Sequence, residues 1–199
     1  DVCSSDLAAT NKNLEQTQLR VTTGLRVSGP KDDAATFAIA QNMRGDIAGM
    51  AAVKTNLALG QSIVNVAIDA GRAIADLLTE MKAKAVQASQ EGLDTDSYVA
   101  LNEELTSLRA QIETIVATAE FNGKNLIASA STDLKVLSTV DGSTIQVTKQ
   151  SIDATTLAIH SASLSNATVA ASALTAINSA IVRVSNALAS LGSGAKRVD

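Results

Sequence analysis

The chain has 199 residues, 46% of them hydrophobic, so it is long and apolar enough to bury a core and is not a disordered polar tail. The formal net charge of −4 and an aromatic content of 2% argue against a nucleic-acid-binding surface, which needs basic and stacking side chains. No apolar run approaches the roughly 20 residues of a membrane span. Alanine occurs 35 times, which favours long helices packed closely through small side chains.

The first seven residues lack the basic and apolar segments of a secretory signal. They read like a translated sequencing-adapter scar, so Cys3 supports no redox role. A single cysteine also excludes an internal disulfide and any metal site built from several cysteines.

Residues 1–29 are predicted to form an arm. Aliphatic residues from Leu7 to Leu25 follow a weak amphipathic pattern, which the Gly29-Pro30 pair interrupts. Asp32 and Asp33 follow, where the start of a new helix favours negative charge. The sequence therefore predicts a break at 28–31 and a helical body after it.

A heptad pattern predicts one long helix over about residues 41–90, packed lengthwise against other helices. Two series of positions, each stepping by seven residues, hold apolar residues or glycine at every position except Asp46. Gly60 and Gly71 within them mark either the close approach of a neighbouring helix or a bend. The two series are Met43, Met50, Leu57, Val64, Gly71, Leu78 and Ala85, and Asp46, Val53, Gly60, Ala67, Ile74, Met81 and Ala88.

A second helix is predicted after the turn at residues 91–96, where glycine and aspartate end one helix and begin the next. Its apolar stripe has a polar opposite face, and the short turn makes the two helices antiparallel neighbours. The stripe consists of Tyr98, Leu101, Leu105, Leu108, Ile112, Ile115 and Ala119.

Residues 133–149 predict a β-hairpin, because two β-favouring runs flank an Asp141-Gly142 pair. Residues 150–166 read as an irregular connector. A third helical stripe follows and is expected to fade at Gly192-Ser193-Gly194. That stripe consists of Ala170, Leu174, Ile177, Ile181, Val184, Leu188 and Leu191.

These elements predict a mainly α fold, an elongated antiparallel helical rod with one small β-hairpin. The predicted organisation is a partial N-terminal arm over 1–29 and a rod core over 30–199. The core carries the hairpin at about 133–149 and the connector at 150–166.

Candidate catalytic groups are few. His160 is the one histidine, which excludes a site built on a histidine pair. It lies in the connector, and because no GxSxG elbow accompanies it we interpret it as an exposed connector residue. The sequence predicts no enzyme, no metal and no cofactor.

Ordered sequence blocks resemble bacterial flagellin, the filament subunit. The first is Thr23-Gly24-Leu25-Arg26-Val27 followed by Lys31-Asp32-Asp33-Ala34-Ala35, and the second is Glu120-Phe121-Asn122-Gly123-Lys124-Asn125-Leu126. The last helix, over 173–191, resembles the first C-terminal helix of that family. The resemblance covers most of residues 11–199.

The resemblance implies a structural subunit of the bacterial flagellar filament, self-assembling for motility, secreted and extracellular. It implies other flagellin subunits, an export chaperone, and cap and hook-junction proteins as partners, and neither nucleic acid nor membrane. The connector takes the place of the variable outer domain. The arm resembles part of an inner-tube segment, and we expect both assembly ends to be truncated, so that the chain would fold but not polymerise normally.

Two sets of surface residues follow. At the junction of arm and body, alternating charges are expected to contact neighbouring subunits; otherwise they belong to an ordinary capped helix start. These residues are Arg20, Arg26, Lys31, Asp32 and Asp33. In the family's innate-immune receptor epitope, Glu80 stands for an arginine and Lys84 for a leucine, which is expected to weaken recognition.

The alternative is another helical coiled-coil structural or signalling protein, such as a secretion-system rod or a chemoreceptor-like hairpin. Such a protein shares the heptads but lacks the ordered blocks and the hairpin between the second and third stripes.

Overall fold

The computed structural model describes the backbone of residues 2–199 and the side chains from Ser5 onward. Asp1 and the side chain of Cys3, and with them the first part of the suspected scar, lie outside the described residues. Two compact units, Asp1–Ala52 and Val53–Asp199, divide the chain, and each is described by itself. Their division falls within a helix, and the arm boundary expected at residue 29 stays a prediction.

The N-terminal unit holds helix α1 (Val2–Thr23) and the first part of α2 (Ala34–Ala88), with the predicted break between them. α1 ends at Gly24, which adopts a φ of 67° and donates its backbone N–H to the Arg20 carbonyl at 2.9 Å. A left-handed residue after the last turn is a common helix end, and glycine adopts it without strain.

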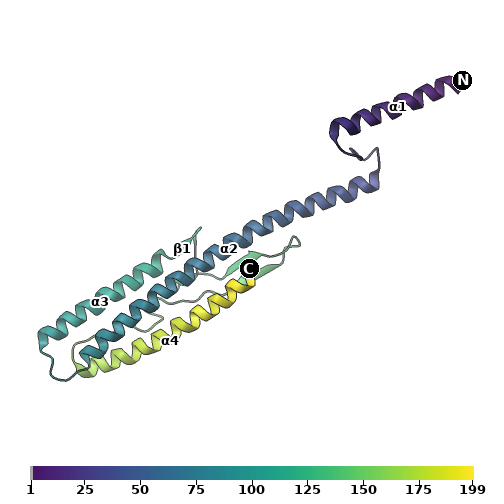
Figure 1. Ribbon diagram of the computed structural model, residues 1–199. Coiled ribbons are helices and arrows are strands. Elements are labelled where there is room, and N and C mark those ends of the chain that lie inside the picture. Colours follow the sequence, from purple (N-terminus) through teal and green to yellow (C-terminus); the bar gives the residue numbers. More distant parts are fainter. Residues whose placement is uncertain (1) are drawn as a thin grey trace. The chain divides into compact units, whose positions relative to one another are not determined.

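The second unit is built on α2, α3 (Thr95–Thr118) and α4 (Ala167–Val198), which run side by side in Figure 1. Asp94 begins α3 by accepting the Ser97 N–H at 3.1 Å, and Asn166 begins α4 by accepting the Val169 N–H at 2.9 Å. Such side-chain acceptors satisfy N–H groups that have no partner in the first helical turn.

The predicted hairpin is present as β3 (Leu134–Leu137) and β4 (Thr144–Val147), with shorter strands than expected. Gly142 in its turn has a φ of 92°. A second antiparallel pair, β1 (Glu120–Phe121) with β2 (Lys124–Asn125), was not predicted. Its turn is Asn122-Gly123, and both residues have positive φ, as a tight two-residue hairpin turn requires.

The heptad pattern of α2 marks the core correctly from Val53 onward, where ten of the predicted positions are buried and Leu57 is half-buried. N-terminal of Val53 the same pattern lies on an exposed surface, because Met43 and Met50 are each more than half exposed. The stripes of α3 and α4 lie in the core along their length. The heptad pattern therefore predicted the helix correctly along its whole length. It predicted which residues are buried only in the second unit.

The two glycines of α2 lie under close contacts in an unbroken helix. A β-carbon on Gly71 would lie 2.8 Å from Leu188 Cδ2 of α4, which confirms the close approach of a neighbouring helix. A β-carbon on Gly60 would lie 2.5 Å from Val136 Cγ2, so there the neighbour is strand β3 and the helix prediction was wrong.

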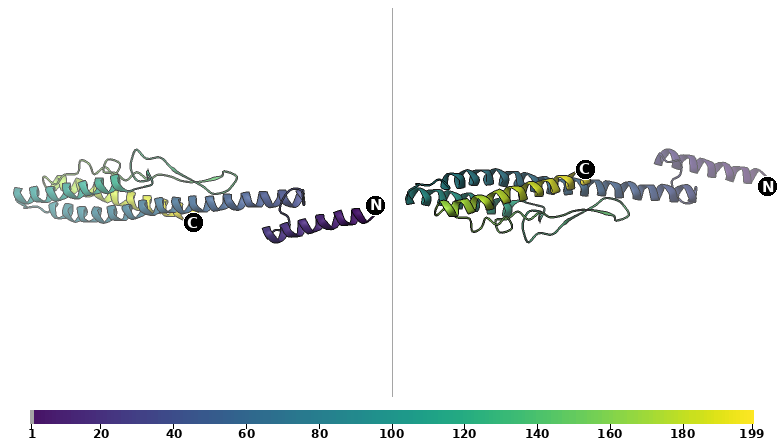
Figure 2. Two further views of the ribbon diagram at one scale, coloured as in Figure 1. Left: turned by 90° about the horizontal axis from the view of Figure 1, so that it is seen from above. Right: turned by 90° about the horizontal axis from the view of Figure 1, so that it is seen from below.

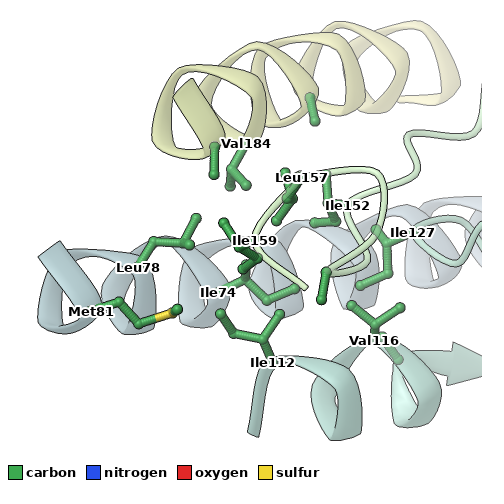
Figure 3. Packing of buried hydrophobic residues seen from close by; sticks show 14 of the residues in the cluster. Ile74, Leu78, Met81, Ile112, Val116, Ile127, Ile152, Leu157, Ile159 and Val184 are labelled. Atoms are coloured by element: carbon green, nitrogen blue, oxygen red, sulfur yellow. The ribbon is translucent and has the colours of Figure 1, made fainter. Parts of the chain in front are cut away.

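The connector contributes to the core, a role that its irregular sequence did not indicate. Ile152, Leu157 and Ile159 point into the same interior as Ile74 of α2 and the side chains of α3 and α4 (Figure 3). Figure 2 shows the non-helical segments of the second unit lying together on one side of α2. The buried side chains of the connector are spaced by a backbone that turns, with Leu157 N donating to the Asp153 carbonyl at 2.9 Å and Ile159 N to the Ala154 carbonyl at 3.0 Å. The segment therefore fills space between the helices without being a strand.

Helix α4 continues to Val198, so the expected fading at Gly192-Ser193-Gly194 was wrong. Among the described helices, α4 is also long and apolar enough to cross a membrane by length and composition, which the search for unbroken apolar runs missed. Its large aliphatic side chains, including Ile177, Val184 and Leu191, are buried in the core.

Candidate subunit-contact surface

The junction between α1 and α2 is organised by the Asp32 carboxylate. Its Oδ2 accepts hydrogen bonds from Ser28 N at 3.0 Å and Ser28 Oγ at 2.8 Å, and its Oδ1 accepts one from Gln16 Nε2 of α1 at 3.4 Å. The two bonds from Ser28, with smaller contributions from Gln16 and the Arg20 charge, hold the pKa of Asp32 below its ordinary value. Asp32 therefore ties the break to α1 within this unit.

Asp33 begins α2. Its Oδ1 accepts the backbone N–H groups of Ala35 and Thr36, both at 3.1 Å, and its Oδ2 accepts the Thr36 hydroxyl at 2.5 Å. The bonds from Thr36 are the main cause of the lowered pKa of Asp33, with a smaller contribution from the Arg26 charge. Asp33 thus has the role of an ordinary helix N-cap, whereas Asp32 braces the break before the helix.

The three basic residues of the junction differ from the aspartates. Arg20, Arg26 and Lys31 are exposed, and within residues 5–199 their side chains form neither a hydrogen bond nor an ion pair. Arg20 lies in the last turn of α1, where a positive charge favours the helix end. The structure thus brings the five junction residues into one short region and leaves three cations with unused donors.

A shallow depression lies beside this junction within the same unit. It is bounded by α1 and by the residues just before α2. Its lining mixes aliphatic and charged groups, which suits contact with another polypeptide. The lining residues are Ala9, Lys12, Asn13, Glu15, Gln16, Leu19, Lys31 and Asp32.

Both helices of the N-terminal unit expose aliphatic stripes that we name the arm stripes. On α1 the stripe is Leu7, Leu14 and Val21, and each of these side chains is more than half exposed. On α2 the stripe is Ile39, Met43, Ile47 and Met50, again each more than half exposed. Positions three or four apart are neighbours on a helix face, so the α2 stripe presents a continuous apolar surface. The α1 side chains are seven residues apart, with polar side chains such as Thr10 and Thr17 between them, so that stripe is interrupted. Contiguous exposed apolar surface marks an interaction site in a folded protein.

The two residues singled out on the second unit lie on one face of α2. Lys84 Nζ is 2.5 Å from Glu104 Oε2 of α3. Glu80, Lys84 and Glu104 line a second shallow depression, which lies in the second unit. Lys84 therefore presents a charge that Glu104 already balances.

Side chains that could bind a metal ion are not gathered together in the part of the chain whose side chains are described. Within residues 5–199, no three histidine, cysteine, aspartate or glutamate side chains lie close enough to hold a metal ion. His160 is exposed, and its carbonyl accepts a hydrogen bond from Arg109 Nη1 at 2.6 Å. The residue therefore helps to position the connector through its backbone.

Comparison with known proteins agrees with this architecture. The family model described as the bacterial flagellin N-terminal helical region matches residues 2–132. Flagellin FljK of Caulobacter vibrioides is 36% identical over 199 residues, and flagellin FljN of the same organism is 40% identical. Both alignments cover the whole of this chain and 73% of the relative.

Solved structures with the same fold have lower sequence identity. A Bacillus cereus flagellin aligns with a TM-score of 0.65 at 23% identity, covering 72% of this chain and 84% of that one. A putative flagellar hook-associated protein from Vibrio parahaemolyticus aligns with a TM-score of 0.69 at 14% identity, covering 86% and 91%. At these identities the two likenesses concern the fold alone.

Proposed function

Because the chain belongs to the bacterial flagellin family, it is a structural subunit of the flagellar filament, and we propose that its N-terminal unit carries contacts to neighbouring subunits. The family polymerises into an extracellular filament, and its role is structural. A secretion-system rod or a chemoreceptor-like hairpin is not favoured, because the matches cover the whole chain and are to flagellins.

The arm stripes are the observation that carries the proposal. A helix with an exposed apolar stripe becomes more stable when another helix covers that stripe, because each large aliphatic side chain that is buried contributes about 1.5–3 kcal/mol. The stripes on α1 and α2 are exposed in the single chain. In a filament, the same helices of neighbouring subunits are present at high local concentration, and we expect their apolar stripes to cover these.

The junction residues divide into two roles within this proposal. Asp32 and Asp33 fix the shape of the break through Ser28, Gln16 and Thr36. Arg20, Arg26 and Lys31 supply exposed donors for carboxylates of the next subunit, which gives orientation and register more than raw affinity. We propose that the arm over 1–29 is part of the inner-tube segment and that the rod core over 30–199 forms the body of the subunit in the filament.

The test uses the complete gene product that carries this chain, expressed in cells whose own flagellins have been deleted. Filaments are counted by negative-stain electron microscopy for the parent protein and for Arg26→Glu. We expect filaments from the parent and a strong reduction for Arg26→Glu. Arg72→Glu is the matched control, because Arg72 is an exposed helical arginine that already pairs with Asp69.

Two results would count against the proposal. Dispersed protein from the parent would contradict filament formation by this subunit. Filaments from Arg26→Glu equal in number and length to those of the parent would contradict the role of the junction and leave the filament function standing.

We also propose that the surface around Glu80 and Lys84 engages the family's innate-immune receptor weakly. The pairing of Lys84 with Glu104 supports this, because a partner must break that pair or accommodate it. A receptor reporter assay is expected to give a weak response that rises for Glu80→Arg combined with Lys84→Leu. An unchanged response would contradict the assignment.

Export and assembly factors complete the proposal. An export chaperone, the filament cap and the hook-junction proteins are proposed partners on the basis of the family alone. Co-purification from flagellated cells tests each of them, with the parent chain as bait.

A further inference from the structure

Residues 192–198 of α4 are helical although their own sequence favours a stop. Gly192 and Gly194 each cost roughly 1 kcal/mol relative to alanine in a helix interior, and glycine is the residue that commonly follows a helix end. The helix nevertheless continues through both glycines to Val198, and Asp199 N still donates to Ala195 O at 3.1 Å. Something outside the local sequence must stabilise these last turns.

Strand β4 supplies that stabilisation through a notch in α4. A β-carbon on Gly194 would lie 2.7 Å from Val147 Cγ1, closer than real β-carbons approach other atoms. Val147 is therefore seated where only glycine leaves room, and both residues are buried. Arg197 Nη1 donates to the Gln146 carbonyl of the same strand at 3.4 Å, which adds a polar contact to the same helix end.

Strand β3 makes the equivalent contact with α2. The side chain of Val136 occupies the notch at Gly60, as described above. The register pairs Leu134 with Val147 and Val136 with Ile145, so both valines point to the same face of the hairpin. One face of one hairpin thus enters a glycine notch in each of two helices.

A direct bond joins the two helices at the same end of the unit. Gln61 Nε2 of α2 donates to Asp199 Oδ1 at 2.8 Å. Gln61 is the neighbour of the notch residue Gly60, and Asp199 directly follows Val198. One contact region is therefore formed by the hairpin, the part of α2 around Gly60 and residues 192–199.

We propose that the β3–β4 hairpin is a conformational latch that keeps residues 192–198 of α4 helical and holds them against α2. With the hairpin seated, Val147 and Val136 fill the two notches and α4 extends to Val198. With the hairpin lifted, the glycines end α4 near residue 192. The latch is a property of the folded subunit and does not rest on its assembly into filaments.

Amide hydrogen exchange on the purified chain tests the latch. In Val147→Ala, exchange of the amides of residues 195–199 is expected to accelerate about tenfold relative to those of residues 177–184 in the same helix, because the lost contact frees the segment after Gly192 alone. Val140→Ala is the matched control, since this valine lies in the hairpin turn and is 44% exposed. Its exchange ratio is expected to equal that of the parent.

Two further variants separate the latch from general destabilisation. Gly192→Ala restores helix propensity where no atom lies within 4 Å of the new β-carbon, so it should reduce the effect of Val147→Ala on the exchange ratio. Gly194→Ala alone should displace Val147, and Val147→Ala in the same chain should make the room that the new methyl group needs.

The proposal is overturned if Val147→Ala and Val140→Ala give the same exchange ratio. It is also overturned if Gly192→Ala leaves the effect of Val147→Ala undiminished. The glycines would then not be the reason why the helix after residue 192 depends on Val147. Rescue of Gly194→Ala by Val147→Ala, but not by Val136→Ala, is the outcome that supports a specific notch.

Discussion

Replacing Ile159 by alanine tests whether the connector is part of the core. The Ile159 side chain is 0% exposed and lies among side chains from α2 and α3 (Figure 3). Removing the larger part of a buried isoleucine costs about 2–5 kcal/mol, and the cost rises when the surroundings cannot collapse into the cavity.

The connector has little freedom to collapse. Arg109 of α3 holds the carbonyl of His160 at 2.6 Å, and the Asn102 side chain accepts the Leu164 N–H at 2.9 Å. Ala158, directly before Ile159, already has a φ of 61°, which few non-glycine residues adopt. We therefore expect a loss in the upper part of the range, about 3–4 kcal/mol.

Such a loss is a large fraction of the about 5–15 kcal/mol that stabilises a typical domain. For a unit of this size it corresponds to a fall in the melting temperature of about 6–16 °C. Urea unfolding followed by circular dichroism measures the free energy directly. Val182→Ala is the control, because this side chain on α4 is 60% exposed and its loss is expected to change stability by less than about 0.5 kcal/mol.

A loss for Ile159→Ala within 1 kcal/mol of the control, on the order of a surface substitution, would refute the reasoning. The connector would then be a loop lying over the helices, and its buried side chains would contribute little to the stability of the unit.

Three further predictions follow from single contacts. Gly71→Ala is expected to lower the free energy of unfolding relative to Gly192→Ala by about 1–3 kcal/mol, because its methyl group meets Leu188 whereas Gly192 has open space; equal denaturation midpoints would contradict this. The pKa of Asp133 is held below 3.8 by hydrogen bonds from Lys149 N first and Gln146 second, so its contribution is present at neutral pH and is lost as the pH falls below 3.8 through the lowered pKa. The parent should therefore be more stable than Asp133→Asn near pH 7 and the two should converge at low pH, whereas a constant difference in acid titrations would exclude this role. Asn166→Ala removes the cap of α4 and should cost about 1 kcal/mol, measured by urea unfolding, whereas Asn166→Asp should retain most of the stability; equal losses in the two variants would show that the side-chain acceptor is not what stabilises the helix start.

The helices were predictable because each one that packs on a core has apolar residues repeated at helical spacing in its own sequence. Leu105 and Ile112 of α3 are seven residues apart, as are Ile177 and Val184 of α4, and all four side chains are buried. The hairpin at residues 133–149 was predictable from its Asp-Gly turn. The pair β1–β2 carries an equally good Asn-Gly signal at residues 122–123, which predicts a tight hairpin when that rule is applied to very short strands.

Other features have no local signal. The continuation of α4 past Gly192 depends on Val147, which lies 45 residues earlier in the sequence. The burial of Ile152 and Ile159 depends on the space that α2, α3 and α4 leave between them. At the junction, the resemblance to flagellin singled out five charges, but only geometry separates the aspartates, which cap and brace the break, from the three exposed cations.

The positions of the buried side chains in the connector determine where foreign sequence can enter this subunit. Inserting a peptide next to Ile152, Leu157 or Ile159 would move a core side chain out of the interior, because each of these side chains is at most 2% exposed. Between His160 and Ser161 the neighbouring side chains face solvent, and hydrogen bonds at His160 and Leu164 hold the segment on either side. An epitope inserted at that point would lie between two exposed residues and would leave the packing of the helices intact.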